Sequence, residues 1–232
     1  MSGHSPSFRK SFVAGCVGLL ALASDLARAD LLLEGSSIAL LTGTTVAAEP
    51  HLAGVVLEDR LDSFSFAGLN GTVSGSIQSR VVRAVDGTVD FYWRVFSDAN
   101  SSDDLRSLRL GQIFTDTYLV NWAADGLGDV SPTSAIRFSG AQSSEFNFNF
   151  DHMDATGAWA GLGAGESSYF MFLDTNATNY AYTGLMDVAD LTHTHISGLL
   201  QTFAPAAAAL PEPGSLALAG LALGALLVRR RR

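Results

Sequence analysis

The sequence predicts an all-β fold, with a single antiparallel β-sandwich or jelly-roll domain between an N-terminal signal helix and a C-terminal membrane helix. Three observations indicate this class. Short runs rich in β-branched and aromatic residues recur between residues 30 and 204, separated by clusters of Gly, Asn, Asp and Ser. Apolar residues in several runs alternate with polar ones, whereas helical periodicity is nearly absent from this region. An Asp-Gly pair between two such runs marks a hairpin.

The hairpin is centred on Asp86-Gly87. Residues 71–85 and residues 88–96 are both β-prone, and a tight turn between them is typical of an Asp-Gly pair. Successive strand residues point to opposite faces, so the second run divides into an apolar row and a more polar row. The row predicted to face the core is Val89, Phe91, Trp93 and Val95. The opposite row is Asp90, Tyr92 and Arg94.

Further strands are predicted on both sides of this hairpin. Residues 145–150 alternate strictly, with three phenylalanines on one side and two asparagines on the other. Many short strands joined by turns favour two sheets packed face to face. The other predicted strands cover residues 38–42, 55–66, 105–114, 117–122, 135–138, 169–174, 180–188 and 195–203, the first two ranges supplying two or three strands.

The first 29 residues are typical of a signal peptide. A basic pair precedes an apolar stretch at residues 12–23, which has about the length that a signal peptide requires. Signal peptidase reads small residues at two positions before its cleavage site, and Ala27 and Ala29 supply them. We therefore expect cleavage before Asp30.

The last 22 residues combine three dissimilar elements. A stiff triplet of Pro211, Glu212 and Pro213 precedes an apolar run at residues 215–228. Fourteen helical residues span about 21 Å, less than a hydrocarbon core of about 30 Å, although arginine side chains and local thinning offset part of this mismatch. A buried terminal core helix is the alternative, but it gives no reason for the four basic residues that follow. These stop-transfer residues are Arg229, Arg230, Arg231 and Arg232.

In this order, the triplet, the apolar run and the arginines resemble the PEP-CTERM sorting signal of Gram-negative bacteria. The resemblance implies recognition by an exosortase-type enzyme, cleavage near the triplet, anchoring in the inner membrane before processing, and final placement at the cell surface or in the extracellular matrix. Residues 71–100 and 163–180 are also similar to bodies that often precede such signals. Residues 205–210 are then expected to form a small-residue linker between residues 30–204 and the signal at 211–232.

Removal of both ends leaves a strongly acidic segment. Seven of the fourteen basic residues lie in the ends but only two of the twenty-three acidic ones, so the remainder carries a formal charge of −14. Such a surface argues against nucleic acid and anionic lipid as partners. The only cysteine and the only lysine also lie in the signal peptide, which excludes disulfides, thiol catalysis and lysine Schiff bases from the body.

Carboxylates supply the weak metal candidates. The loop at residues 98–104 carries Asp98, Asp103 and Asp104, hard oxygen ligands of the kind that calcium takes. The loop lacks the glycine and the terminal glutamate of an EF-hand, and a solvated turn between strands is the simpler interpretation. Calcium is therefore a candidate cation, and no cofactor is assigned.

A histidine pair offers a second weak metal candidate. On a strand, His193 and His195 would point the same way and form a two-nitrogen clip, with Asp187 or Asp190 as a third ligand. Two solvated histidines at a strand edge are the simpler interpretation, because no further ligand cluster accompanies them.

Two functional hypotheses follow. The first is an exported non-catalytic surface or matrix protein with adhesive or carbohydrate-binding activity, and it assigns no catalytic residue. The second is a secreted polysaccharide hydrolase that uses two carboxylates from different strands in a cleft. Polysaccharide is a candidate partner in both, besides signal peptidase and an exosortase. Candidates for a sugar-stacking face are Trp93, Trp122, Trp159, Tyr92 and Tyr180, although most such residues in β-sandwiches belong to the core.

Overall fold

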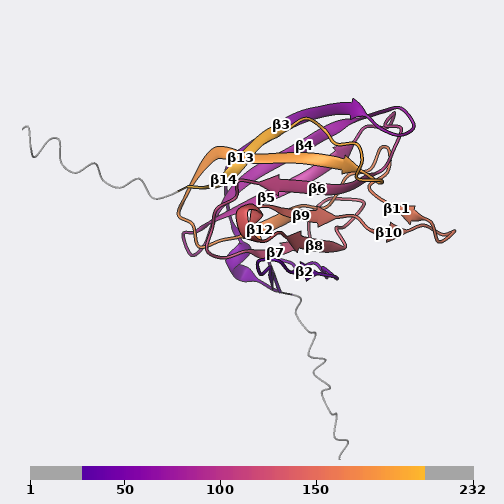
Figure 1. The fold of residues 1–232 in the computed structure, drawn as a ribbon. Coiled ribbons are helices and arrows are strands. Elements are labelled where there is room, and N and C mark those ends of the chain that lie inside the picture. Colours follow the sequence, from indigo (N-terminus) through magenta and orange to yellow (C-terminus); the bar gives the residue numbers. More distant parts are fainter. Residues whose placement is uncertain (1–27, 207–232) are drawn as a thin grey trace, which may run out of the picture.

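The computed structural model describes residues 28–206 as two antiparallel six-stranded sheets, an arrangement consistent with a β-sandwich (Figure 1). The first sheet, sheet A, has the order β1 (Asp30–Leu31), β7 (Leu119–Trp122), β12 (Met171–Asp174), β5 (Val89–Ser97), β4 (Thr72–Ala84) and β3 (Gly54–Ala67). The second, sheet B, has the order β14 (Leu200–Ala206), β13 (Asn179–Asp190), β6 (Leu105–Gly111), β9 (Phe146–Asn149), β8 (Ser134–Arg137) and β2 (Ser37–Ile38).

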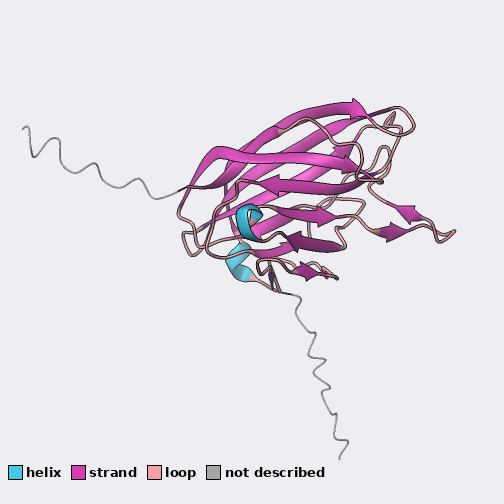
Figure 2. Ribbon diagram, in the orientation of Figure 1, coloured by secondary structure: helices cyan, strands magenta, loops and turns pink. Residues whose placement is uncertain are grey.

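The remaining elements lie outside these sheets. A small hairpin of β10 (His152–Met153) and β11 (Trp159–Ala160) projects from one end of the molecule, at the right of Figure 1. Two short 3₁₀ helices, η1 (Pro50–Leu52) and η2 (Gly140–Gln142), are the only helical segments among the described residues (Figure 2). The expectation of an all-β body is therefore confirmed.

The predicted hairpin is present. Strands β4 and β5 pair antiparallel around the turn, where Gly87 has a φ of +93°, a conformation that favours glycine. The four residues predicted to face the core are at most 1 % exposed. Asp90 lies on the opposite face, as its parity requires, yet it is also fully buried. The sequence pattern identified the face but not the segments that cover it.

Trp93 of β5 joins the two sheets at the centre of the core. Its indole Nε1–H donates a hydrogen bond of 2.7 Å to the Thr202 hydroxyl on β14. Its ring also packs edge-on against Phe146 of β9, with the ring centroids 6.2 Å apart. Both partners belong to sheet B. One buried side chain of sheet A therefore holds two strands of sheet B, β14 and β9.

Strand β3 forms one edge of sheet A. The predicted range 55–66, which together with residues 38–42 was expected to supply two or three strands, forms one strand of 14 residues. The register between β3 and β4 shifts between Val56 and Glu58, which marks a β-bulge. Most of its side chains are exposed. Its exposed charged residues include Glu58, Asp59 and Arg60.

The last predicted strand differs from the structure at both ends. It was expected at residues 195–203, but β14 begins at Leu200, because residues 195–199 make only an isolated bridge, between Ile196 and Ala189, before the chain joins the sheet. β14 continues to Ala206, two residues into the expected linker. Pro205 lies opposite Tyr180 on this edge strand, where a missing N–H is tolerated.

Most residues of the two expected terminal signals fall outside the described residues. Residues 1–27, which contain the expected signal helix and Ala27, are not described. Residues 207–232, which contain the Pro211–Pro213 triplet, the apolar run and the four arginines, are not described either. Within residues 28–206, no helix has the length and apolar character needed to cross a membrane. Strands β1 and β2 lie at one edge of their sheets and β14 lies at the opposite edge of sheet B.

The hydrogen bond between the sheets leads to a prediction about stability. Thr202→Val keeps the shape of the side chain but leaves the buried Trp93 N–H without an acceptor, so unfolding should require about 1–3 kcal/mol less. Thr202→Ser keeps the acceptor and should lose less. Urea unfolding followed by tryptophan fluorescence measures both values. Equal losses in the two variants would contradict the role given to this bond.

Candidate functional site

An open groove lies at the end of the sandwich from which the β10–β11 hairpin projects. Its volume is about 650 Å³, and its walls come from the loops before β6, after β7 and before β12 together with the hairpin itself. It is therefore assembled from segments far apart in the sequence. The side chains that give the groove its chemistry are Asp104, Trp122, Asp129, His152, Glu166 and Tyr169.

Two aromatic rings form one wall of the groove. Trp122, the last residue of β7, and Tyr169, just before β12, are half-buried, with ring centroids 4.9 Å apart and planes tilted by 49°. The indole Nε1–H donates to the Leu41 carbonyl, 3.3 Å away. Gly43 also packs against the indole, where a Cβ atom would lie 2.5 Å from the ring. The tryptophan is thus held in place, and Tyr169 covers it on the side of the groove.

Three carboxylates line the rest of the groove, each fixed by backbone N–H groups through one oxygen. Asp104 Oδ2 accepts from the Gly161 N–H at 3.2 Å, and Glu166 Oε2 accepts from the Gly163 N–H at 2.7 Å. Asp129 Oδ2 accepts from the N–H and the hydroxyl of Ser167, at 2.9 and 2.8 Å, and these bonds lower the pKa of Asp129. Among the described residues, none bonds to the second oxygen of these three groups.

Asp104 and Glu166 approach each other across Gly163. A Cβ atom placed on this glycine would lie 3.6 Å from Asp104 Oδ1 and 3.1 Å from Glu166 Oε2. The two oxygens therefore lie within about 7 Å of each other, which overlaps the separations at which carboxylate pairs hydrolyse glycosides. The sequence does not indicate that these two carboxylates lie close together, because the two residues lie in loops 62 positions apart.

A second carboxyl pair lies on the outward face of sheet A. Asp174 follows Leu173, which pairs with Phe91, and so lies opposite Asp90 on the neighbouring strand. Burial, and next the charge of Asp174, raise the pKa of Asp90 to about 8. Burial also raises the pKa of Asp174, although His51 opposes the shift by donating from Nε2 to Asp174 Oδ2 at 3.1 Å.

The Asp90–Asp174 pair has a structural role and is not a catalytic pair. Asp90 is fully buried and cannot touch a polysaccharide chain, so it is not one half of a glycosidase pair. With a pKa of about 8 it holds a proton at neutral pH, and its Oδ1 accepts a hydrogen bond of 3.3 Å from the Thr175 N–H. The pair was not recognised in the sequence, because Asp90 fell on a face that was expected to be solvated.

The three aspartates proposed as calcium ligands do not converge. Asp98 accepts from the Ser74 hydroxyl at 2.7 Å, whereas Asp103 accepts from the backbone and side chain of Asn70. Asp104 points into the groove. Across residues 28–206, no group of three or more His, Cys, Asp or Glu side chains is arranged to hold a metal ion.

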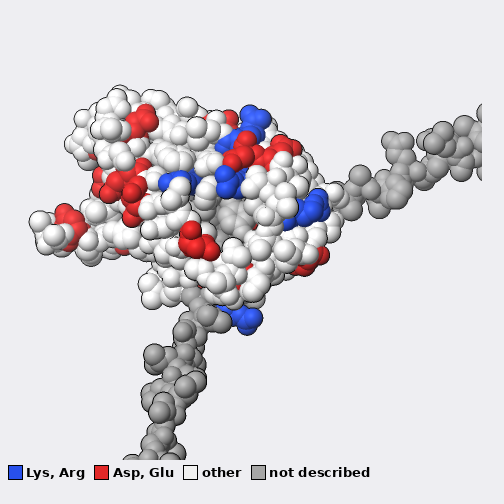
Figure 3. Space-filling model, turned by 180° about the vertical axis from the view of Figure 1, so that it is seen from behind, with Lys and Arg blue, Asp and Glu red and all other residues white. Residues whose placement is uncertain are grey.

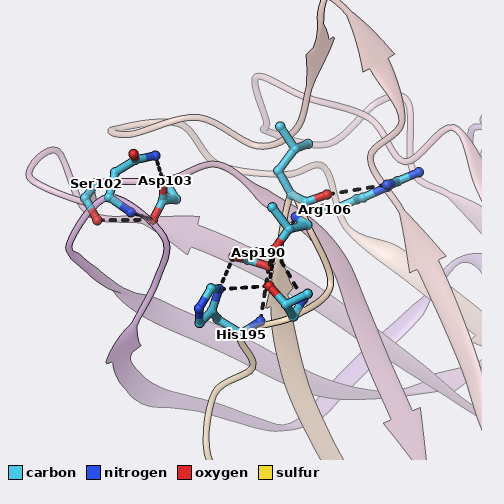
Figure 4. A network of polar contacts seen from close by, with 9 residues as sticks. Ser102, Asp103, Arg106, Asp190 and His195 are labelled. Atoms are coloured by element: carbon cyan, nitrogen blue, oxygen red, sulfur yellow. Dashed lines mark hydrogen bonds and ion pairs between the residues drawn. The ribbon is translucent and has the colours of Figure 1, made fainter.

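The histidine pair is not a clip, as Figure 4 shows for His195. This residue is turned toward Asp190, and its Nδ1 lies 2.7 Å from Asp190 Oδ2. Burial raises the pKa of Asp190, but the hydrogen bonds from His195 and Thr192 outweigh burial, and the net shift is downward. Asp187 instead forms a two-point ion pair with Arg109, at 2.5 and 2.8 Å.

The five aromatic residues proposed as a stacking face occupy different surfaces. Trp93 lies in the core, and Tyr92 lies on the outward face of β5. Trp159 is 53 % exposed on β11 and packs over the guanidinium of Arg106, 5.4 Å from its ring centroid. Of the five, Trp122 alone lines the groove, and its partner Tyr169 was not among the candidates. A tyrosine at the start of a predicted strand carries no sequence signal for such a contact.

One residue of the expected signal cleavage site is described. The Ala29 N–H donates to Glu49 Oε1 at 2.9 Å, and the following residue begins β1. The structure thus accommodates the chain on both sides of the expected cleavage point.

The pKa of Asp90 predicts how stability depends on pH. The unfolded chain loses this proton near pH 4 and the folded chain near pH 8, so stability should fall as the pH rises through this interval, by a few kcal/mol on an order-of-magnitude estimate. Asp90→Asn mimics the protonated group and should flatten the curve between pH 5 and 9. Asp98→Asn, at an exposed position, is the control. Unfolding in urea at a series of pH values tests this, and an unchanged slope in Asp90→Asn would contradict it.

Comparisons with known proteins provide no further guide to this site. A scan of the chain against protein-family models, a search of curated proteins and a search of solved structures all found no match. The assignment of a function therefore depends on the chemistry of the groove and on the two terminal motifs.

Proposed function

We propose that this protein is an exported, non-catalytic component of the cell surface or extracellular matrix that binds polysaccharide in the groove. The observation that carries the proposal is the Trp122–Tyr169 wall, which lines an open hollow beside fixed carboxylates. A sugar ring presents C–H groups on its faces and hydroxyls around its rim. An aromatic surface next to oriented hydrogen-bond acceptors matches both features.

The charge of the groove restricts the ligand. Ionised carboxylates accept hydrogen bonds from hydroxyls, which suits a neutral polysaccharide, and repel the carboxylates or sulfates of a polyanion. The face in Figure 3 likewise carries more Asp and Glu than Lys and Arg, and the segment between the two expected signals has a formal charge of −14. We therefore assign neutral sugars as the ligand class and exclude nucleic acid.

The terminal motifs supply the route of delivery. Signal peptidase would cleave after Ala29, and an exosortase-type enzyme would read the Pro211-Glu212-Pro213 triplet while residues 215–228 hold the chain in the inner membrane. The body between them is proposed to be one jelly-roll-like sandwich. This is supported by the path of the chain, which passes from β5 in sheet A to β6 in sheet B, back to β7 in sheet A and then to β8 in sheet B.

A specific observation favours one other function. Asp104 and Glu166 lie within about 7 Å of each other in the groove, from different loops, as an acid and a nucleophile or base of a glycoside hydrolase would. Polysaccharide binding and hydrolysis would therefore use the same groove, and they differ in whether this pair reacts.

Binding is tested at Tyr169. Tyr169→Ala removes the ring that covers Trp122 and should weaken binding to a neutral β-glucan or mannan at least about tenfold, equivalent to about 1.4 kcal/mol. Tyr169→Phe keeps the ring and should bind nearly as wild type does. Trp159→Ala, which removes an exposed aromatic outside the groove, is the matched control. Affinity electrophoresis measures all three, with a polyuronate as the acidic comparison. If the polysaccharide slows all three variants as strongly as it slows the wild type, the groove is not the binding site.

Hydrolysis is tested separately with the carboxylates. The proposal predicts no release of reducing ends from the polysaccharide that binds best, with wild type and with Glu166→Gln and Asp104→Asn alike. Release by the wild type that is abolished by either substitution, with binding retained, would establish the hydrolase instead. Asp129→Asn, which alters a third groove carboxylate outside this pair, is the control.

A further inference from the structure

Glu49 is a buried carboxylate with an incomplete set of partners. It is 5 % exposed and directly precedes η1. Its Oε1 accepts from the Ala29 N–H, whereas its Oε2 has no hydrogen-bond partner among the described residues. A carboxylate removed from water with one oxygen unbonded is unfavourable, and such a group calls for a partner.

Signal-peptide removal would change what faces this carboxylate. Hydrolysis of the Ala29–Asp30 bond consumes one water, leaves a carboxylate on Ala29 and creates an α-ammonium on Asp30. The Ala29 N–H that now bonds Glu49 departs with the signal peptide. The new ammonium lies one residue further along, a step of about 3.5 Å, and carries three donors.

The position of the new terminus is fixed by the sheet. Asp30 pairs with Val120 and Leu31 with Leu119, so β1 is held against β7 independently of the residues before it. The following N–H, that of Leu32, donates to the Tyr118 carbonyl at 2.8 Å. An ammonium on Asp30 would therefore stay beside Glu49.

We propose that Glu49 is a built-in acceptor for the α-ammonium of Asp30, so that removal of the signal peptide completes a buried ion pair and locks β1 onto sheet A. This inference rests on the cleavage site given under the proposed function. It assigns Glu49 a role in maturation and none in ligand binding, since the residue does not line the groove.

The charged groups around this site are acidic. The side chain of Asp30 has its pKa raised, first by burial and then by the charge of Glu49. The carboxylates of Asp30 and Glu49 both favour a cation at this position, and the neighbouring basic residue in the sequence, Arg28, would leave with the signal peptide.

The composition makes the amine easy to study. Lys10 is the only lysine of the sequence, so a chain that begins at Asp30 has a single amine, its own N-terminus. Amine-directed reagents therefore modify one atom. Acetylation with an N-hydroxysuccinimide ester removes the charge, and reductive methylation with ¹³C-formaldehyde keeps it and provides an NMR signal.

The experiment uses the processed protein recovered from outside the cell, with its first residue established by intact mass and N-terminal sequencing. The pKa of the ¹³C-methylated amine should lie at least about one unit higher in wild type than in Glu49→Gln, and acetylation at pH 7 should be about tenfold slower. A raised amine pKa stabilises the fold below the unfolded value near 7.7–8.0, and this stabilisation is lost as the pH rises through the folded value. Glu58→Gln, on β3 at the opposite edge of sheet A, is the control and should match wild type.

The outcomes separate the inference from the proposal on which it rests. A first residue of Asp30 with the same amine pKa in wild type and Glu49→Gln would overturn the role of Glu49 and leave the cleavage site standing. A different first residue would overturn the cleavage site and the inference together. If Glu49→Gln does not fold, wild type decides: acetylation should lower the melting temperature and methylation should not, and equal melting temperatures would overturn the inference.

Discussion

The arrangement of the molecule depends on the burial of one row of side chains between two sheets. Trp93 lies at the centre of that row, where it packs on Phe146 and donates to Thr202. These three residues come from strands that are distant in the sequence, and their contact fixes sheet A over sheet B. The loops at the strand ends are placed as a consequence. The groove and the hydrogen bond between Ala29 and Glu49 are both built from such loops or from the segment beside the edge strand.

The strands were largely predictable from the sequence because alternation reports directly on which residues leave water. The hairpin around Asp86-Gly87 and the buried phenylalanines of β9 followed this rule. The rule is local, so it does not tell what packs on the outward face of a strand. Asp90 is buried there beside Asp174 and the Thr175 N–H that bonds its Oδ1, and no pattern in residues 88–96 indicates this. The last strand was predicted to begin five residues too early, at residue 195, because the sequence does not show that residues 195–199 make only an isolated bridge.

The groove was less predictable than the fold. Trp122 and Asp104 were named as candidates for different roles, stacking and calcium binding, but Tyr169 and Glu166 were not named for this site. Their association is a property of the tertiary structure, because loops from four parts of the chain meet only after both sheets have formed. The terminal motifs present the opposite case. They are recognised from composition and residue order alone, and their proposed role is tested by the processing and location of the chain in the cell.

The bulged, charged edge at β3 has a consequence for how copies of this chain can associate. An unprotected sheet edge invites the same edge of another copy to add to it, and the result is a fibre. Here the register shift beside Val56 interrupts the row of backbone groups, and Glu58, Asp59 and Arg60 would require desolvation before a second copy could dock. Both features oppose the pairing of β3 with the same strand of a second copy, so this edge of sheet A favours separate molecules over a continuous sheet.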